Sequence, residues 1–209
     1  MERFVVTIAR ENGSGGRVIG EKLADRLKVP FYNRDLLRLA SDESGISEQL
    51  FAKADEDARR TRLFRVAQDA FRGEVIPPDR DDFVSNENLF RYQARIILEL
   101  ARTESCVIIG RCADYILKDH KNAVRIFIHA PLEERVATIM RRHNLSEDAA
   151  RKEIARVDKR RANYYRTFTG SDWRDAGHYD LCLDSAALGQ DRCVELAAGF
   201  LALRLGEKV

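Results

Sequence analysis

Hydrophobic positions along the chain form two patterns, short continuous runs and longer stretches with helical spacing. The runs predict strands at residues 4–8, 29–32, 106–111, 124–128 and 179–183. Between them, apolar residues recur four positions apart, as at Ile19, Leu23 and Leu27, with charged residues on the other side. Strands that alternate with amphipathic helices predict an α/β fold, in which helices cover both faces of a parallel sheet.

Helical patterns fill most of the remaining chain. They cover residues from 33 onward, 47–72, 85–102, 131–143, from 146 onward and 194–205. Asn33 and Ser146 stand where helix N-caps are expected. Residues 41–84 are hard to interpret because charge is dense there, and Pro77-Pro78-Asp79 predicts a loop.

Composition narrows the class of protein. The 209 residues carry 36 Lys+Arg and 34 Asp+Glu, a net charge of +2, and 44% are hydrophobic. This length and composition predict one globular domain and argue against a disordered or collagen-like chain. The four cysteines lack C-x-x-C spacing, so we expect reduced thiols and no structural metal site. No run approaches the roughly 20 apolar residues of a membrane helix, and the apolar N-terminal stretch is too short for a signal peptide, so we expect a cytoplasmic protein without membrane contact.

A glycine-rich turn follows the first predicted strand, where an α/β sheet commonly holds a phosphate. The standard phosphate loop is G-x-x-x-x-G-K-[ST]. In this chain Gly15 fits the second glycine, but Arg10 stands at the first glycine, Gly16 at the lysine and Arg17 at the metal-binding hydroxyl. A plain turn that joins strand to helix is the alternative. The two arginines favour phosphate binding, because guanidinium groups can supply the missing lysine's charge in bidentate form.

Basic residues are concentrated in one segment. Residues 141–174 hold ten basic and five acidic side chains, a local charge of +5 that leaves −3 for the rest. Arg156 and Arg160 stand four apart on a predicted helix, where like charges repel unless an anion lies between them. A solvated helix face is the alternative. The distribution favours a small phosphate-bearing partner, with no nucleic acid spread over the surface.

The glycine turn is also where the chain begins to resemble a known family. Residues 6–17 resemble the opening of the cytidylate kinase-like family of P-loop nucleoside monophosphate kinases, whose loop reads S-R-E-x-G-S-G-G-R. Further ordered matches lie at residues 31–37, 107–117, 141–143, 158–165 and 179–181, and residues 42–84 match least.

The resemblance implies a three-layer fold with a five-stranded parallel sheet and a helical lid. The core would comprise 1–35, 103–140 and 176–209, with an acceptor-binding region at about 36–102 and a lid at about 141–175. It implies phosphoryl transfer from ATP, with Mg²⁺, to a nucleoside monophosphate, most readily CMP or dCMP.

The resemblance also assigns roles to individual residues. ATP phosphates would be bound by Arg10, Asn12, Gly13, Ser14, Gly15, Gly16 and Arg17. The acceptor would be bound by Arg34, Asp35, Arg111 and Asp114. The lid residues would be Arg141, Arg142, Arg156, Asp158, Arg160 and Arg161. The catalytic residues would be Arg10, Arg17, Arg111, Arg156 and Arg160.

Some of these roles have alternatives in the residues themselves. Arg111 directly follows an apolar strand, at the sheet edge where ligands bind, although a surface arginine is the plain interpretation. Asp35 is either an acceptor contact or a first-turn helix acid. We expect Asp158 to orient neighbouring guanidinium groups. No metal ligand is assigned, because Ser14, Glu11, another acid or water would have to replace the loop hydroxyl.

Two other functions remain open at this point. The chain could be a nucleotide-binding sensor that lost catalysis with the loop lysine, or a kinase of another small acceptor. A homodimer is a further possibility.

Overall fold

The centre of the molecule is a five-stranded sheet in which every pair of neighbouring strands is parallel. The structure, a computed structural model, describes residues 3–33, 35–57 and 73–206. The strands are β1 (Val5–Arg10), β2 (Phe31–Tyr32), β3 (Cys106–Ile109), β4 (Ala123–His129) and β5 (Leu181–Asp184). Their order in the sheet is β2-β3-β1-β4-β5. This confirms the predicted five-stranded parallel sheet.

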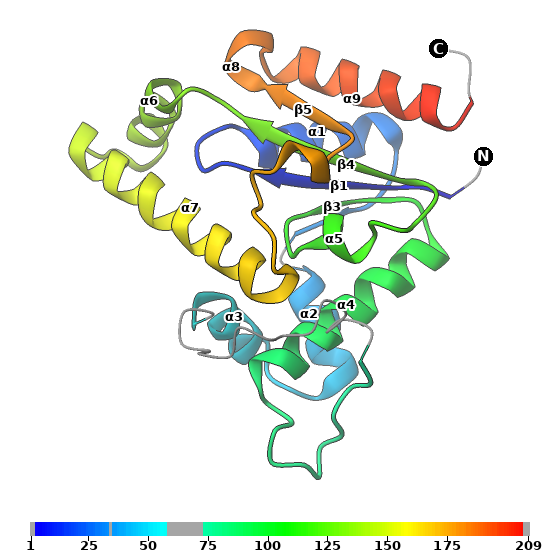
Figure 1. Cartoon of the computed structure of the whole chain (residues 1–209). Coiled ribbons are helices and arrows are strands. Elements are labelled where there is room, and N and C mark those ends of the chain that lie inside the picture. Colours follow the sequence, from blue (N-terminus) through cyan, green and yellow to red (C-terminus); the bar gives the residue numbers. More distant parts are fainter. Residues whose placement is uncertain (1–2, 34, 58–72, 207–209) are drawn as a thin grey trace.

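Helices cover both faces of this sheet, which confirms the three-layer prediction (Figure 1). The helices are α1 (Gly16–Leu27), α2 (Asp35–Ser44), α3 (Glu48–Asp57), α4 (Asn86–Thr103), α5 (Ala113–Ile116), α6 (Leu132–His143), α7 (Glu147–Thr169), α8 (Ser185–Leu188) and α9 (Gln190–Arg204), with a 3₁₀ turn at Ala176–His178. The second half of the helical pattern predicted at 47–72 lies outside the described residues.

Alternation along β1 divides the core into two clusters. Val6 and Ile8 pack with α1 and α9 on one face, whereas Val5 and Ala9 pack with α4, α5 and the end of α7 on the other. Successive strand residues point to opposite faces, so a strand covered on both sides must be apolar at nearly every position. This is why β1 reads as a continuous hydrophobic run.

Three strands are shorter than predicted, and the one predicted at 106–111 ends at Ile109. The predicted strand at 29–32 is reduced to Phe31–Tyr32, and Pro30 before it contributes only its carbonyl, which accepts from the N–H of Val107 at 2.9 Å. The last strand begins at Leu181, because Tyr179 instead turns into the core and donates its hydroxyl proton to the carbonyl of Trp173.

The strand order creates a crevice at the carboxyl edge of the sheet. From β1 the chain crosses to β2 and β3 on one side, and then passes back over β1 to β4 and β5 on the other. In open α/β sheets, ligands bind outside the strand ends where the order reverses in this way. The loops that follow β1 and β3 meet at this point.

The helices α6 and α7 form a hairpin beside this edge (Figure 1). Near its tip the two helices share a small cluster of Val136, Ile139, Ala150 and Ile154. The last turns of α7 belong to the main core, where the Phe168 ring stacks on Phe90 with centroids 4.1 Å apart. The hairpin is therefore anchored in the core at one end, and its role as a lid stays a prediction.

Within the described parts of the chain, no helix is both long and apolar enough to span a membrane.

We expect Phe90→Ala to destabilise the protein by about 3–5 kcal/mol, because it deletes a ring that is 1% exposed and removes the support of α7. The measurement is urea unfolding of the purified variant. Leu203→Ala is the control, since Leu203 is 70% exposed and its truncation should change the free energy of unfolding by less than about 0.5 kcal/mol. Equal effects of the two substitutions would contradict this packing.

Candidate functional site

The loop between β1 and α1 is held in a shape that requires glycine. Gly13 and Gly15 have φ of +86° and +76°, in the left-handed region that side chains rarely adopt. A Cβ on Gly13 would lie 2.8 Å from the carbonyl oxygen of Arg135, and one on Gly15 would lie 3.1 Å from Nε2 of Gln190. The loop is thus pressed closely against its neighbours in the fold.

The first turn of α1 has neither a capping side chain nor an acidic residue. Gly15, its N-cap, has no side chain to accept from the N–H groups, and the first turn contains no acidic residue. The partial positive charge of this helix end is therefore not neutralised by the helix itself, as a phosphate-binding site requires.

Arg10 passes between two glycines. It is the last residue of β1, and a Cβ on Gly16 would lie 2.6 Å from its Cβ. A Cβ on Gly110, in the loop after β3, would collide with its Nη1. The absence of side chains at Gly16 and Gly110 therefore creates the channel through which the Arg10 side chain crosses from β1 to the β3 loop.

The loop after β3 contains three consecutive left-handed residues. Gly110, Arg111 and Cys112 have φ of +76°, +61° and +53°. Such a conformation is unfavourable for the two non-glycine residues and is often found at functional sites. It directs this short loop along the wall of the crevice, where all three residues line a cavity.

This cavity, of about 560 Å³, is bordered by an excess of positive charge. Five arginines line it, namely Arg10, Arg17, Arg111, Arg160 and Arg161, and the carboxylates among its described lining residues are Glu48 and Asp114. Gathering guanidinium groups away from water is unfavourable unless anions accompany them. The cavity is therefore suited to a multiply charged anion.

The pKa values of two cavity arginines reflect this crowding. Burial and the nearby Arg161 and Arg111 lower the pKa of Arg10 well below its ordinary value. Burial also lowers the pKa of Arg161 to about 10, although Asp158 opposes the shift. Burial is the main cause of both shifts, because it disfavours the charged form of a guanidinium, and the neighbouring arginines add to it.

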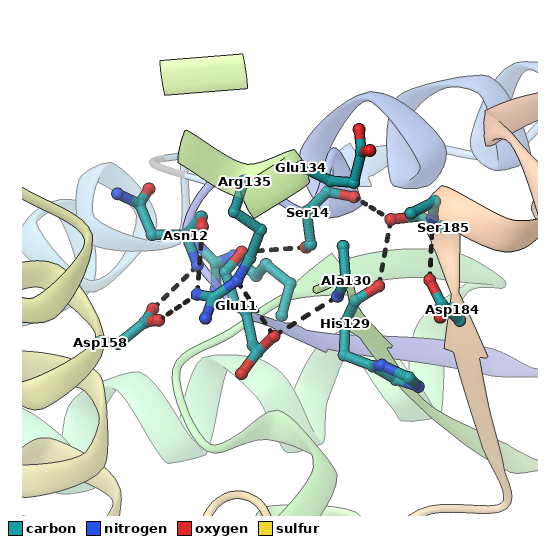
Figure 2. Close-up of polar contacts among 12 residues, drawn as sticks. Glu11, Asn12, Ser14, His129, Ala130, Glu134, Arg135, Asp158, Asp184 and Ser185 are labelled. Atoms are coloured by element: carbon teal, nitrogen blue, oxygen red, sulfur yellow. Dashed lines mark hydrogen bonds and ion pairs between the residues drawn. The ribbon is translucent and has the colours of Figure 1, made fainter. Parts of the chain in front are cut away.

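A buried ion-pair network holds the phosphate loop to the α6–α7 hairpin (Figure 2). Asp158 of α7 accepts from the backbone N–H of Asn12 at 2.8 Å and from Nη1 of Arg135 at 2.6 Å. Glu11 lies 3.4 Å from Nε of Arg135 and 3.0 Å from Nη2 of Arg174. The Asp158 and Arg135 side chains are each 8% exposed, so the network is shielded from water. We call Glu11, Asn12, Arg135 and Asp158 the loop latch.

The structure brings several predicted site residues together. Residues 11–15 form the loop between Arg10, the last residue of β1, and Gly16, the first residue of α1. The predicted residues that line the cavity are Arg10, Arg17, Arg111, Asp114, Arg160 and Arg161. Arg17 lies at its rim, where its side chain is 64% exposed and pairs with Glu21 at 2.8 Å. Asp158 contacts the loop by accepting from the N–H of Asn12.

Other predicted residues lie elsewhere. Arg141, Arg142 and Arg156 are exposed on the hairpin and do not line the cavity. Asp35 is exposed at the start of α2, and its neighbour Asn33 lines the cavity instead. Arg34 lies outside the described residues.

Sequence reasoning missed Arg135, although a signal was present. Arg135 precedes Val136 and stands four residues before Ile139 on the buried face of α6, and all three are buried. A charged residue on the apolar face of a helix requires a buried partner. The position therefore implied an ion pair, but its partner Asp158 lies 23 residues away and only the fold reveals it.

The described residues present no preformed magnesium site built from protein ligands alone. They contain no group of three or more His, Cys, Asp and Glu arranged around a possible ion. The Ser14 hydroxyl donates to the carbonyl of Glu11 at 2.9 Å, and the Glu11 carboxylate is already paired with Arg135 and Arg174. Of the replacements that the sequence offered for the loop hydroxyl, Glu11 is therefore engaged in ion pairs.

The five-stranded parallel sheet and the glycine turn before α1 define an α/β protein with the fold of the P-loop kinases. The chain belongs to the cytidylate kinase-like family, whose model matches residues 5–187. This confirms the resemblance inferred from the motifs and places the chain among kinase-type phosphotransferases.

Three known proteins illustrate the relationship. The chain is 28% identical to the cytidylate kinase of Natronomonas pharaonis, over 90% of this chain and 84% of that protein. A crystal structure of an uncharacterized protein from Eubacterium ventriosum superimposes with a TM-score of 0.69 at 24% identity, covering 95% of this chain and 98% of that one. Shikimate kinase from Bacteroides thetaiotaomicron has a TM-score of 0.52 at 13% identity, covering 97% and 98%, and so shares the fold.

We expect Asp158→Ala to destabilise the protein by about 3–5 kcal/mol, because it leaves the buried Arg135 guanidinium without its shortest ion pair. Urea unfolding measures this. The control is Asp42→Ala, which breaks an exposed pair with Arg38 on α2 and should cost about 0.2–0.5 kcal/mol. A loss as small as that of the control would show that the latch contributes nothing to stability.

A second prediction concerns pH. Asp114 is buried and accepts from the Tyr165 hydroxyl at 2.6 Å, and burial raises the pKa of its carboxyl. The folded state therefore holds this proton more tightly than the unfolded state does, so ionisation destabilises the fold as pH rises through the ordinary aspartate range.

We expect Asp114→Asn to become increasingly stable relative to the wild type as pH is raised from 4 toward 8. The amide cannot ionise, and its oxygen can still accept from Tyr165. Urea unfolding of both proteins across this range gives the difference in unfolding free energy. A difference that is constant or that shrinks with pH would contradict the direction of the shift.

Proposed function

We propose that this protein catalyses ATP-dependent phosphoryl transfer to a nucleoside monophosphate, with CMP or dCMP as the preferred acceptor. The observation that carries the proposal is the clustering of five arginines around one cavity at the carboxyl edge of the sheet. Membership of the cytidylate kinase-like family supports the reaction, and relatives named cytidylate kinase support the acceptor.

The two substrates would approach from opposite sides of Arg10. The phosphate loop and the uncapped end of α1 suit the ATP phosphates, because they offer backbone N–H groups and a partial positive charge. The acceptor phosphate would lie beside Arg111. The remaining lining includes Leu37, Tyr164 and Trp173 together with the polar Asn33 and Glu48, a combination suited to a nucleobase.

Phosphoryl transfer between these substrates requires positioning and charge neutralisation more than covalent work by the protein. An oxygen of the acceptor phosphate attacks the γ-phosphorus of ATP, and the bond between that phosphorus and the β–γ bridging oxygen breaks. ADP leaves, and the acceptor becomes a diphosphate. The attacking oxygen is already ionised at neutral pH, so the step needs no general base.

The cavity arginines would stabilise the negative charge that spreads over the transferred group. Asp158 is suited to orienting one of them, Arg161, whose Nη1 lies 3.7 Å from its Oδ1. Magnesium would enter as part of the MgATP substrate. The cytoplasmic location and the homodimer stay predictions from the sequence.

The test is a panel of CMP, dCMP, UMP, AMP and GMP with MgATP, followed by chromatographic detection of the diphosphate. We expect turnover of CMP and dCMP, and a roughly 10²–10³-fold loss of kcat in Arg111→Gln, which removes one preorganised donor. The matched control is Arg102→Gln, on the exposed surface of α4, which should retain activity.

ATP binding without turnover of any acceptor would favour a sensor and contradict the proposal. Turnover of a non-nucleotide acceptor alone would show that the fold serves another small-molecule kinase. Equal activity of Arg111→Gln and Arg102→Gln would remove Arg111 from the site.

A further inference from the structure

The chain lacks the lysine of the standard phosphate loop, and two arginines are candidates to replace its charge. This question rests on the proposed function, because the lysine's task is to neutralise phosphate charge during transfer. Arg17 follows the lysine position directly in sequence, whereas Arg10 stands six residues before it, at the end of β1. Their surroundings in the fold distinguish them.

The side chain of Arg10 occupies the place where a lysine at position 16 would begin. A Cβ on Gly16 would lie 2.6 Å from Cβ of Arg10, 3.1 Å from its Cγ and 3.3 Å from Cβ of Ile128. Cβ atoms essentially never approach other atoms within 3.0 Å, so this chain cannot hold both Arg10 and a side chain at position 16 without a shift. The arginine at position 10 therefore requires a glycine at position 16.

The far end of Arg10 lies among the cavity arginines. Its Nη1 passes against Gly110. The guanidinium groups of Arg161, Arg111 and Arg160 are close enough to lower its pKa. The guanidinium thus lies between the phosphate loop and the β3 loop, which are the two places where the proposed substrates present phosphate.

Arg17 has a different environment. Its side chain is 64% exposed, and its Nε donates to Glu21 one turn further along α1 at 2.8 Å. An exposed charge with its own partner contributes little to electrostatic stabilisation in a high-dielectric medium.

We infer that Arg10 is the catalytic residue that takes over the task of the loop lysine, and that Gly16 and Gly110 are positioning residues that open its path. The positive charge therefore comes from the last residue of β1, where the standard loop has it on the first turn of the following helix. From there one guanidinium reaches both the phosphates of ATP and the phosphate of the acceptor.

The test exchanges the two residues. Arg10→Gly with Gly16→Lys would recreate G-x-x-x-x-G-K, because glycine at position 10 vacates the space that a lysine at position 16 needs. The variants are Arg10→Gln, Arg10→Gly, Gly16→Lys, the double variant and Arg17→Gln.

Arg26→Gln, on the exposed end of α1, is the matched control for loss of one charge. Circular dichroism and thermal unfolding identify variants that fold.

We expect Arg10→Gln, which keeps most of the side-chain stem, to lower kcat by about 10²–10³-fold. Gly16→Lys alone should lose ATP affinity because of the clash with Arg10. The double variant should bind ATP at least tenfold more tightly than either Arg10→Gly or Gly16→Lys. Arg17→Gln should lower kcat less than tenfold, and Arg26→Gln should match the wild type.

A double variant that folds but binds ATP no better than its weaker parent would overturn the inference, as would a larger loss in Arg17→Gln than in Arg10→Gln. ATP binding is measured by calorimetry without an acceptor, so this readout is independent of turnover. If no acceptor is turned over but the exchange restores ATP binding, the proposed reaction fails and the role of Arg10 in binding phosphate stands. If CMP is turned over but the exchange restores nothing, the reaction stands and this inference fails.

Discussion

The structure depends on keeping an excess of guanidinium charge at one edge of a parallel sheet. Five arginines line the cavity there, and the buried carboxylate of Asp158 lies 3.7 Å from Nη1 of one of them, Arg161. Repulsion between these groups must be balanced by the rest of the fold until an anion arrives. Asp158 contributes to this balance, because its carboxylate pairs with the buried Arg135 and also lies 3.7 Å from Nη1 of Arg161.

This constraint connects elements that lie far apart in the chain. The N–H of Asn12 is bonded to a side chain 146 residues later, and Arg161 of α7 donates to the carbonyl of Arg10 at 3.0 Å. The position of the α6–α7 hairpin is therefore coupled to the shape of the phosphate loop. A movement of the hairpin, such as a lid would make, has to preserve or exchange these bonds.

Most of the fold was predictable because the central strands β1, β3 and β4 are covered on both faces and read as apolar runs. The loop and Arg111 were also found from sequence, since glycines and a charged residue directly after a strand are local signals. The steric pairing of Arg10 with Gly16 and Gly110 was not predictable, because Gly110 becomes a neighbour only when β3 pairs with β1. The same holds for Arg135 and Asp158, and for Asn33 lining the cavity in place of Asp35.

The most direct test of the central claim uses the anion alone. Inorganic tripolyphosphate without magnesium carries the charge of the ATP phosphates but no base, and adenosine carries the base but no phosphate. Because a ligand of the folded state raises the melting temperature, the account predicts a saturable rise in Tm with tripolyphosphate and little change with adenosine at the same concentration. A rise with adenosine and none with tripolyphosphate would contradict it.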